Sequence, residues 1–388
     1  MKKPISLAFE RFSKAYLQQY SATIEQHKVI DCVQACKTER LGFNVEACQD
    51  CGSMTTHYNS CGNRHCPNCQ AIHKDRWILI KQNDLLPVKY HHTVFTIPSE
   101  LRTLFLHNKK ILYNLLFTTA WETINDFSKN PQNRIEAKMG MIAVLHTWKQ
   151  NLDYHPHLHC IIPAGGITDN NKWKSSPTSG DYLFNTCTLA AVFKGKFLQA
   201  LKQLYKDRNL KFWDLKDQGP KAYFYQLKEK LYAKDWLVYS KKSFKNEQSV
   251  FEYLGRYTHK IAISNARIKQ VTNNEVAFEY TDRADDCKKK IRRIGGVQFL
   301  KLFLQHVLPA RFMKIRNYGI LSSRSKTEYL TKMHEYFDMS IYQKPPKLLI
   351  IEVLEIVYGV KIGQCKHCGG KMVLVESKAR PRASPKVA

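Results

Sequence analysis

The sequence lacks the two features that would direct it to a membrane or out of the cell. No apolar run among the 388 residues reaches membrane-spanning length, because the longest candidate, 348–360, is interrupted by Glu352 and Glu355. The basic start at residues 1–3 is followed by no apolar core, which argues against a signal peptide. We therefore expect a cytoplasmic protein whose 12 cysteines are reduced thiols or metal ligands rather than disulfides.

Acidic residues are also scarce. Asp and Glu total 33 against 61 Lys and Arg, which leaves a net charge of +28. A surplus of that size predicts a large polyanionic partner, and its spread along most of the chain favours a broad basic groove over one basic tail. A membrane surface would also attract this charge, but no segment could span one. The hydrophobic content of 44% excludes a disordered protein, and the length allows two or three domains.

Seven cysteines crowd into residues 32–69. Two of the pairs have the spacing Cys-x-x-Cys, at Cys48 with Cys51 and at Cys66 with Cys69. Each such knuckle offers two thiolates to a tetrahedral ion, so we expect the two knuckles to complete one zinc site. Four further candidates would remain for a second site: Cys36, Cys61, His57 and His65.

A third Cys-x-x-Cys knuckle lies near the end of the chain, at Cys365 and Cys368, with no partner pair close to it in the sequence. It either ligates zinc together with cysteines from elsewhere in the chain or is a degenerate zinc ribbon. The sequence leaves both readings open. Cys32, by contrast, is typical of a small buried residue.

A second group of candidate ligands is a run of histidines within residues 153–163, which read as a strand. Side chains alternate faces along a strand, so His157 and His159 project from the same face. An apolar run over 141–148 contains His146, and the short polar connection that follows predicts an antiparallel hairpin. The hairpin would bring His146 beside the other two as a third metal ligand. Extension of the strand through Pro156 would allow His155 to join them. The alternative is a set of hydrogen-bonded core histidines.

The stretch 250–260 holds two tyrosines four residues apart. On a helix Tyr253 and Tyr257 would share one face. Tyrosines at this spacing usually belong to a core. The neighbouring cations Arg256 and Lys260 favour a chemical role, because positive charge stabilises both a phenolate and a phosphate.

The remaining pattern predicts an alternation of helices and strands. We expect a strand over 87–98 that carries His91 and His92 in a structural role by default, although one of them could approach the metal. Residues 312–319 interleave basic and aromatic side chains, which suits a surface that binds a nucleic-acid strand. Helices are expected over 1–30, 99–125, 189–207, 297–307 and 348–358, further strands over 236–240, 261–268 and 276–280, and a basic disordered tail over 377–388.

Five motifs in one order give the sequence a family resemblance. They are the cysteine module ending in residues 59–70, His146-Thr147-Trp148, His155-Pro156-His157-Leu158-His159, Tyr253-Leu254-Gly255-Arg256-Tyr257, and His306-Val307-Leu308-Pro309. Together they resemble the rolling-circle transposases of the insertion-sequence ninety-one type. These belong to the wider class of HUH (His-hydrophobic-His) single-strand DNA nucleases. The likeness runs from about residue 36 to residue 321.

The resemblance implies an α+β fold. An antiparallel sheet would carry the His-Leu-His strand, with helices packed on it and the tyrosine helix facing the metal. It implies three regions: an N-terminal helix and zinc-binding domain over 1–80, an HUH nuclease domain over 86–330, and a C-terminal region over 331–388 with a helix, the single knuckle and a basic tail.

The resemblance also implies a reaction on single-stranded DNA at transposon ends and target. Tyr253 or Tyr257, helped by Arg256, would attack a phosphodiester and leave a 5′-phosphotyrosine. His157, His159 and His146 would hold Mg²⁺ or Mn²⁺, and Zn²⁺ would be held by Cys48, Cys51, Cys66, Cys69, Cys36 and Cys61. Imidazoles suit manganese or zinc better than magnesium, so the sequence does not choose the ion. A nucleoid-associated location in the cytoplasm would follow.

Two other functions remain open at this stage. A replication initiator or relaxase would share the nuclease chemistry, although the zinc module and the tyrosine pair favour the transposase. A non-catalytic zinc-containing DNA-binding protein would use the histidines as structural residues only. Nicking assays with added Mn²⁺ would separate this second alternative from the nucleases, because such a protein would cut nothing.

Overall fold

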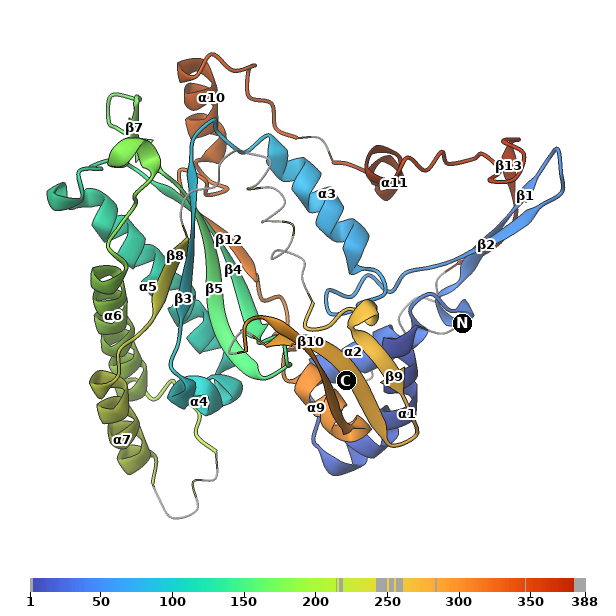
Figure 1. The fold of residues 1–388 in the computed structure, drawn as a ribbon, viewed down its shortest axis with the longest axis horizontal. Helices are drawn as coiled ribbons and strands as arrows, with labels where there is room; N and C mark the ends of the chain where they lie inside the picture. Colours follow the sequence, from blue (N-terminus) through green and yellow to red (C-terminus); the bar gives the residue numbers. More distant parts are fainter. Residues whose placement is uncertain are drawn as a thin grey trace.

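The centre of the molecule is a five-stranded antiparallel sheet in the order β12-β4-β5-β3-β8 (Figure 1). It is seen in a computed structural model that describes residues 3–213, 215, 219–241, 250, 255, 261–282, 285–345 and 347–379. Both faces of the sheet are covered, which explains why its inner strands read as nearly continuous apolar runs. The strands are β3 (Tyr90–Thr96), β4 (Gly140–Trp148), β5 (Tyr154–Pro163), β8 (Val238–Lys241) and β12 (Ile315–Gly319).

One face of this sheet packs against helices from the middle of the chain and forms the largest core (Figure 1). Asn185 starts α6, since its Oδ1 atom accepts hydrogen bonds from the backbone N–H groups of Cys187 and Thr188 at 3.0 and 3.1 Å. The single helix expected over 99–125 is interrupted at Asn108, whose Nδ2 group donates to the carbonyls of Leu104 and Lys211. The helices are α4 (Arg102–His107), α5 (Lys109–Lys129), α6 (Thr186–Lys206) and α7 (Pro220–Ala233).

The opposite face carries a smaller core that includes Ile142 of β4 and Ile161 of β5. Two helices lie on this side, α3 (Gln70–Gln82) and α10 (Lys326–Tyr336) (Figure 1). Val250 is buried in the same core. Because side chains alternate along β4 and β5, the residues that share this face with Ile142 and Ile161 include the expected histidine ligands.

A second body joins the start of the chain to residues near 300. The helices α1 (Pro4–Gln19) and α2 (Ile24–Ala35) share a core with α9 (Gly296–Leu304) and with β10 (Glu275–Asp282). A Cβ atom at Gly296 would lie 2.2 Å from the Phe12 ring, so this close approach of α9 to α1 requires glycine. The body also contains the strands β9 (Ile268–Val271) and β11 (Lys288–Gly295).

The strand expected over 261–268 is wrong for most of its length. Residues 261–264 have no regular structure, and a short 3-10 helix, η5 (Asn265–Arg267), precedes the strand β9. Asn265 accepts a hydrogen bond from the N–H of Ile5 and donates one to Asn68. These contacts to α1 and the cysteine loop override the β-branched pattern of the segment.

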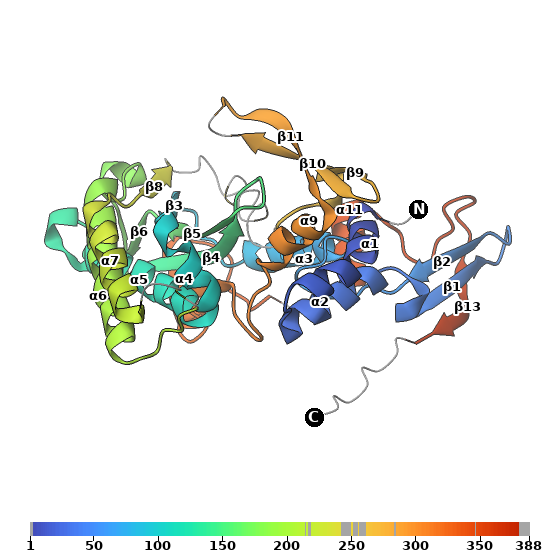
Figure 2. The same cartoon turned by 90° about the horizontal axis from the view of Figure 1, so that it is seen from below.

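A three-stranded ribbon projects from these bodies (Figures 1 and 2). Its order is β13-β1-β2, so β13 (Met372–Lys378) from the end of the chain pairs with β1 (Phe43–Cys48), which also pairs with β2 (Met54–Tyr58). The expected boundaries at 80 and 331 therefore do not separate the ends of the chain in space. Residues 380–388 of the expected tail lie outside the described residues.

Two smaller elements complete the fold: α11 (Ile350–Tyr358), which packs on α3, and the pair β6 (Gly165–Ile167) and β7 (Trp173–Ser175). The architecture confirms the expected α+β class, with antiparallel sheets, packed helices and an N-terminal cysteine module. No helix in the described ranges is long and apolar enough to cross a bilayer.

Candidate functional site

The hairpin of β4 and β5 brings three histidines together. His146 lies directly opposite His157 in the strand register, and Val144 lies opposite His159. The three residues offer ligand nitrogens that all lie within 4.8 Å of one another, and no described carboxylate joins the group. His146 and His159 are buried, and His157 is half-buried. The hairpin predicted from the sequence therefore exists, and it places the three imidazoles as expected.

Hydrogen bonds orient two of these rings toward a common point. His157 Nδ1 lies 2.6 Å from the carbonyl oxygen of His155 and donates to it, which leaves the Nε2 lone pair of His157 available. His157 Nε2 and His159 Nε2 are 3.1 Å apart. Two nitrogens that bind one ion at about 2.1 Å and at right angles would be roughly 3.0 Å apart. The donor set and its spacing thus fit a divalent cation that accepts imidazole.

His92 of β3 contacts this group through His159. Its Nε2 atom lies 2.9 Å from His159 Nδ1, and the two rings are stacked with centroids 5.1 Å apart. When His159 Nδ1–H donates to His92, the Nε2 atom of His159 is left free to bind a cation. His91 points elsewhere, with its Nε2 atom 2.9 Å from the carbonyl of Gly180. The default structural role holds for His91, whereas His92 contacts an expected ligand.

The expectation that His91 or His92 could approach the metal left open which of the two does so, and the strand register decides it. In the β3–β5 register Val94 lies opposite His159, and His92 is two residues from Val94 on the same strand. Alternation therefore puts His92 on the histidine face, diagonally adjacent to His159. The position of His92 beside His159 therefore follows only when the pairing of β3 with β5 is known.

His155 is not part of the ligand group. Its Nδ1 atom is buried and has no hydrogen-bond partner among the described residues. Burial lowers the pKa of His155 to about 3, so the ring is neutral at physiological pH. His155 therefore does not join His157 and His159 as a candidate ligand.

His306 holds the turn end of the histidine hairpin. Its Nδ1 atom lies 3.1 Å from Thr147 Oγ1, and its Nε2 atom donates to the carbonyl of Leu152 at 3.0 Å. Burial lowers the pKa of His306 to about 3, which keeps the ring neutral. Trp148 stacks on His146 with ring centroids 4.7 Å apart. The His306 motif therefore acts on the ligand strand through Thr147 and Leu152.

The expected catalytic residues Tyr253, Arg256 and Tyr257 lie outside the described residues. Three described residues lie beside this segment in the sequence. Val250 is buried in the core on the histidine face of the sheet, and a Cβ atom at Gly255 would lie 2.4 Å from Ile78 Cδ1 of α3. Ile261 lines a pocket together with Thr147 and Trp148, the residues that follow His146.

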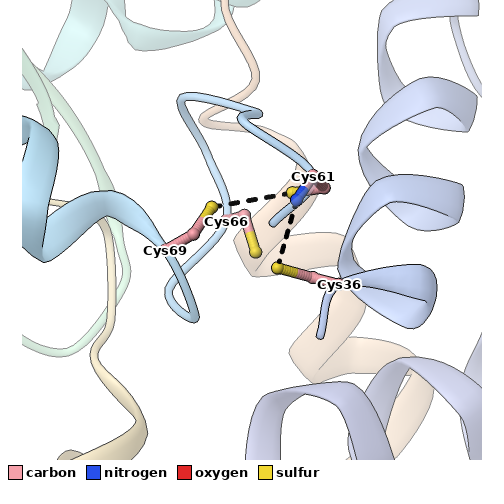
Figure 3. Close-up of side chains that lie close together, drawn as sticks. All are labelled: Cys36, Cys61, Cys66 and Cys69. Carbon is pink, nitrogen blue, oxygen red and sulfur yellow. Dashed lines mark hydrogen bonds between the residues drawn. The ribbon is translucent and has the colours of Figure 1, made fainter. Parts of the chain in front are cut away.

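The cysteines form two separate clusters, each with four sulfur atoms within 4.8 Å of one another. Cys36 at the end of α2, Cys61 in a loop, and the knuckle of Cys66 and Cys69 before α3 form the first, which is buried (Figure 3). Cys61 Sγ lies 3.7 Å from Cys69 Sγ. Sulfurs bound to one tetrahedral zinc at about 2.3 Å would be roughly 3.8 Å apart.

The second cluster joins Cys48 and Cys51 to Cys365 and Cys368. The expectation that the knuckles at 48–51 and 66–69 share one zinc is therefore wrong. Phe43 lies opposite Tyr58 at the base of the β1–β2 hairpin, while Cys48 lies near its tip. Five residues of extended strand span about 17 Å, so Cys48 lies at the far end of the hairpin from Phe43 and Tyr58. The chain then returns along β2 toward Cys36 before it reaches Cys61.

Neither histidine considered for a second zinc site joins a cluster. His57 is exposed on β2, with its Nε2 atom 3.6 Å from a carboxylate oxygen of Glu46. His65 Nε2 accepts a hydrogen bond from the N–H of Leu308 at 3.3 Å. Burial is the main cause that lowers the pKa of His65 well below its ordinary value. Both therefore have structural partners instead of a metal.

Comparisons with known proteins agree with the two parts of this arrangement. A family model described as "Putative transposase" matches residues 140–328, and one described as "Transposase zinc-binding domain" matches residues 8–97. The three histidines lie in the first range and the buried cysteine cluster in the second, whereas Cys365 and Cys368 lie outside both.

Two relatives match over most of the chain. A protein of Sinorhizobium fredii named "Putative transposase y4qJ" is 33% identical over 377 residues, which cover 95% of this chain and 94% of the relative. The transposase for insertion sequence element IS801 of Pseudomonas savastanoi pv. phaseolicola is 27% identical over 348 residues, or 87% of this chain and 80% of the relative. No solved structure matches the chain significantly.

Proposed function

This chain belongs to the transposases of the insertion-sequence ninety-one type, which act on DNA, and from that premise we propose that it cuts and rejoins single-stranded DNA through a 5′-phosphotyrosine. One observation carries the proposal: His146, His157 and His159 converge on one face of a rigid sheet, with the lone pair of His157 set by a backbone carbonyl. A purely structural histidine cluster would not need its ligand atoms directed at one point.

The three histidines would hold Mg²⁺ or Mn²⁺, which when bound would polarise the scissile phosphate and offset the charge that develops on its oxygens. The protein's own part is to keep the rings in place. Trp148 packs against His146, His155 O orients His157, and His92 orients His159. This support is built into neighbouring strands, so the ligand nitrogens need little reorganisation to bind the ion.

Tyr253 or Tyr257 would supply the nucleophile. The phenolic oxygen forms a bond to phosphorus, the bond from phosphorus to the 3′ oxygen breaks, and the released 3′ oxygen takes up a proton while the phenol loses one. In the sequence, Gly255 lies between the two tyrosines, two residues from each. Gly255 lies against Ile78, on the face of the sheet that carries the histidines. Arg256 would stabilise both the phenolate and the phosphate.

The covalent ester conserves the energy of the phosphodiester, so a free 3′-OH can reverse the step without a nucleotide cofactor. Two tyrosines would let one strand be held while another is cut. The net charge of +28 would supply most of the affinity for DNA through phosphate contacts, which depend steeply on salt. Base sequence would have to be read by other contacts.

The test is formation of a covalent adduct on single-stranded oligonucleotides that cover the ends of the element that carries this chain. The oligonucleotides are labelled at the 3′ end, incubated with Mn²⁺ or Mg²⁺ and run on denaturing gels. We expect an adduct with the single strand and none with the matched duplex. A Tyr253→Phe/Tyr257→Phe double variant should form none, while Tyr239→Phe, an exposed tyrosine of β8, should react normally. An undiminished adduct in the double variant would overturn the assignment of the nucleophile.

Histidine variants test the other half of the proposal. His157→Ala or His159→Ala should abolish the adduct and leave DNA binding largely intact, because phosphate contacts elsewhere carry the affinity. His146→Ala should raise the Mn²⁺ concentration needed for half-maximal adduct. His27→Ala, an exposed histidine of α2, is the matched control. Full activity of His146→Ala at limiting Mn²⁺ would remove His146 from the ligand set.

A further inference from the structure

We propose that Cys48, Cys51, Cys365 and Cys368 hold a second structural zinc ion, which fastens the end of the chain to its beginning. The four sulfur atoms lie within 4.8 Å of one another. Cys48 Sγ is 3.5 Å from Cys368 Sγ, and Cys51 Sγ is 3.7 Å from Cys365 Sγ. These distances are close to the roughly 3.8 Å expected between two sulfurs on one tetrahedral zinc and far from the 2.05 Å or so of a disulfide.

The two knuckles have the same backbone structure although they are far apart in the sequence. In each, the glycine after the second cysteine donates its N–H to the carbonyl of the first: Gly52 to Cys48 at 3.1 Å, and Gly369 to Cys365 at 2.9 Å. Both glycines have φ in the left-handed region, at 71° and 78°. The N–H of the first cysteine bonds the carbonyl five residues on, Ser53 or Gly370, at 2.9 and 2.7 Å.

This repeated turn directs backbone donors at the sulfur atoms. In the C-terminal knuckle the N–H of His367 donates to Cys365 Sγ and that of Gly370 to Cys368 Sγ, each at 3.4 Å. Such bonds stabilise the negative charge of thiolates, which four cysteines carry when they bind a metal. Four neutral thiols would gain little from them. Soft thiolate ligands in a tetrahedral set select zinc over hard cations such as magnesium.

The knuckles also fit against each other closely. The N–H of Gln49 donates to the carbonyl of Lys371 at 3.0 Å, which continues the β1–β13 ladder into the knuckles. A Cβ atom at Gly370 would lie 2.0 Å from Asp50 Oδ2 and 3.1 Å from Asp50 Cβ, so the two knuckles approach each other closely at this glycine. The sulfurs of the two halves are brought to the same end of the ribbon because Cys48 pairs with Met372.

Among the described residues, the ribbon has no hydrophobic core that could hold it in the absence of metal. No residue of β1, β2 or β13 belongs to the three core clusters found among the described residues. Every residue of β2 is exposed, and within β1 only Val45 and Cys48 are buried. Isolated strands with so little apolar burial are marginal, and small metal-bound modules replace a core with ligand bonds. The ion would close a loop of 314 to 320 residues.

The proposal does not depend on the nuclease chemistry, and its test measures metal directly. The full-length wild-type protein should contain two zinc ions per chain by mass spectrometry of the metal. A Cys365→Ser/Cys368→Ser variant should contain one, and so should Cys48→Ser/Cys51→Ser. Cys187→Ser, an exposed cysteine of α6 outside both clusters, should keep two. One zinc in the wild type, or as much zinc in either double variant as in the wild type, would overturn the proposal.

A second measurement needs no variant and so does not depend on a mutant that folds. Cys51, Cys368, Cys187 and Cys287 are all exposed. During brief alkylation of the native protein with N-ethylmaleimide, Cys51 and Cys368 should be protected by bound zinc, while Cys187 and Cys287 react. Removal of zinc with a chelator should expose Cys51 and Cys368 together. Alkylation of these two at the rate of Cys187 in the untreated protein would contradict a metal site.

Discussion

The two four-cysteine clusters offer the same ligands in opposite surroundings. Cys36, Cys61, Cys66 and Cys69 are all buried and belong to the core that α1, α2, α9 and β10 share. In the second cluster, Cys51 and Cys368 are exposed, and no neighbouring strand belongs to a described core. The first cluster draws on one short stretch of sequence, while the second joins stretches more than 300 residues apart.

The difference shows that equal ligand sets can contribute differently to stability. In the buried cluster, a metal and a hydrophobic core hold the same elements, so loss of the ligands leaves a cavity and buried thiols inside a packed body. In the exposed cluster, the metal replaces a core, so its loss should release only the ribbon. Four predictions, from the largest expected effect to the smallest, test this contrast.

Cys66→Ser should have the largest effect. Structural zinc contributes roughly 10 kcal/mol or more in small modules, which exceeds the net stability of many domains. We expect the N-terminal helical body to lose its cooperative thermal transition, as measured by circular dichroism. Cys160→Ala, a buried cysteine of β5 outside both clusters, should cost only about 1 kcal/mol. Equal transitions in Cys66→Ser and wild type would contradict the structural role of the buried cluster.

Acid should weaken the buried core through His306, which packs beside it. Burial depresses the folded-state pKa of His306 to about 3, below the ordinary value of 6.5. The unfolded state therefore binds more protons between these values, so stability is complete above about pH 6.5 and falls as the pH drops toward 3. At pH 5 the loss attributable to His306 is about 2 kcal/mol.

Denaturant unfolding at several pH values measures this slope. His306→Gln removes the titrating ring, so the difference in unfolding free energy between this variant and wild type should narrow as the pH falls from 7 to 5. A difference that is constant with pH would show that His306 is not held neutral. The exposed ribbon contains no comparably buried histidine among its described residues. Hydrogen exchange of its backbone amides should therefore not follow the titration of His306.

Cys365→Ser/Cys368→Ser should leave the main thermal transition nearly unchanged, within about 2 °C, because the ribbon adds no side chain to the described cores. The local effect should be large: backbone amides of β13 should lose protection in hydrogen exchange, and those of β4 and β5 should keep it. A drop in the main transition as large as that of Cys66→Ser would abolish the contrast between the clusters.

Lys378→Ala should have the smallest effect. Lys378 Nζ lies 3.1 Å from Glu39 Oε1 at the base of the ribbon, and both side chains are exposed. Exposed ion pairs contribute about 0–1 kcal/mol and are screened by salt. Hydrogen exchange of β13 should therefore change little in this variant compared with the zinc-ligand variant. Equal loss of protection in both would show that the ion pair, and not metal, holds β13.

The sequence predicted local features well. Alternation along residues 153–163 and the short connection after residue 148 were enough to expect His146, His157 and His159 together, because a hairpin pairs neighbouring segments. The helices expected over 189–207 and 297–307 correspond to α6 and α9, whereas the single helix expected over 1–30 is divided into α1 and α2 because Thr23 caps the start of α2. Features that depend on contacts between distant segments were harder to predict. His92 contacts His159 only through the pairing of β3 with β5, and the segment 261–267 is not a strand because Asn265 bonds to α1 and the cysteine loop.

The cysteines show the limit most clearly. The spacing Cys-x-x-Cys determined by itself that each knuckle presents two thiolates, because a tight turn and its glycine are local properties of the chain. Spacing does not say which knuckles meet. That choice was made by the β1–β2 hairpin, which places Cys48 and Cys51 at the far end of a strand about 17 Å long, and by the pairing of β13 with β1. Only the tertiary structure could decide it, because a metal ion binds whichever ligands the fold brings within reach, regardless of their distance along the chain.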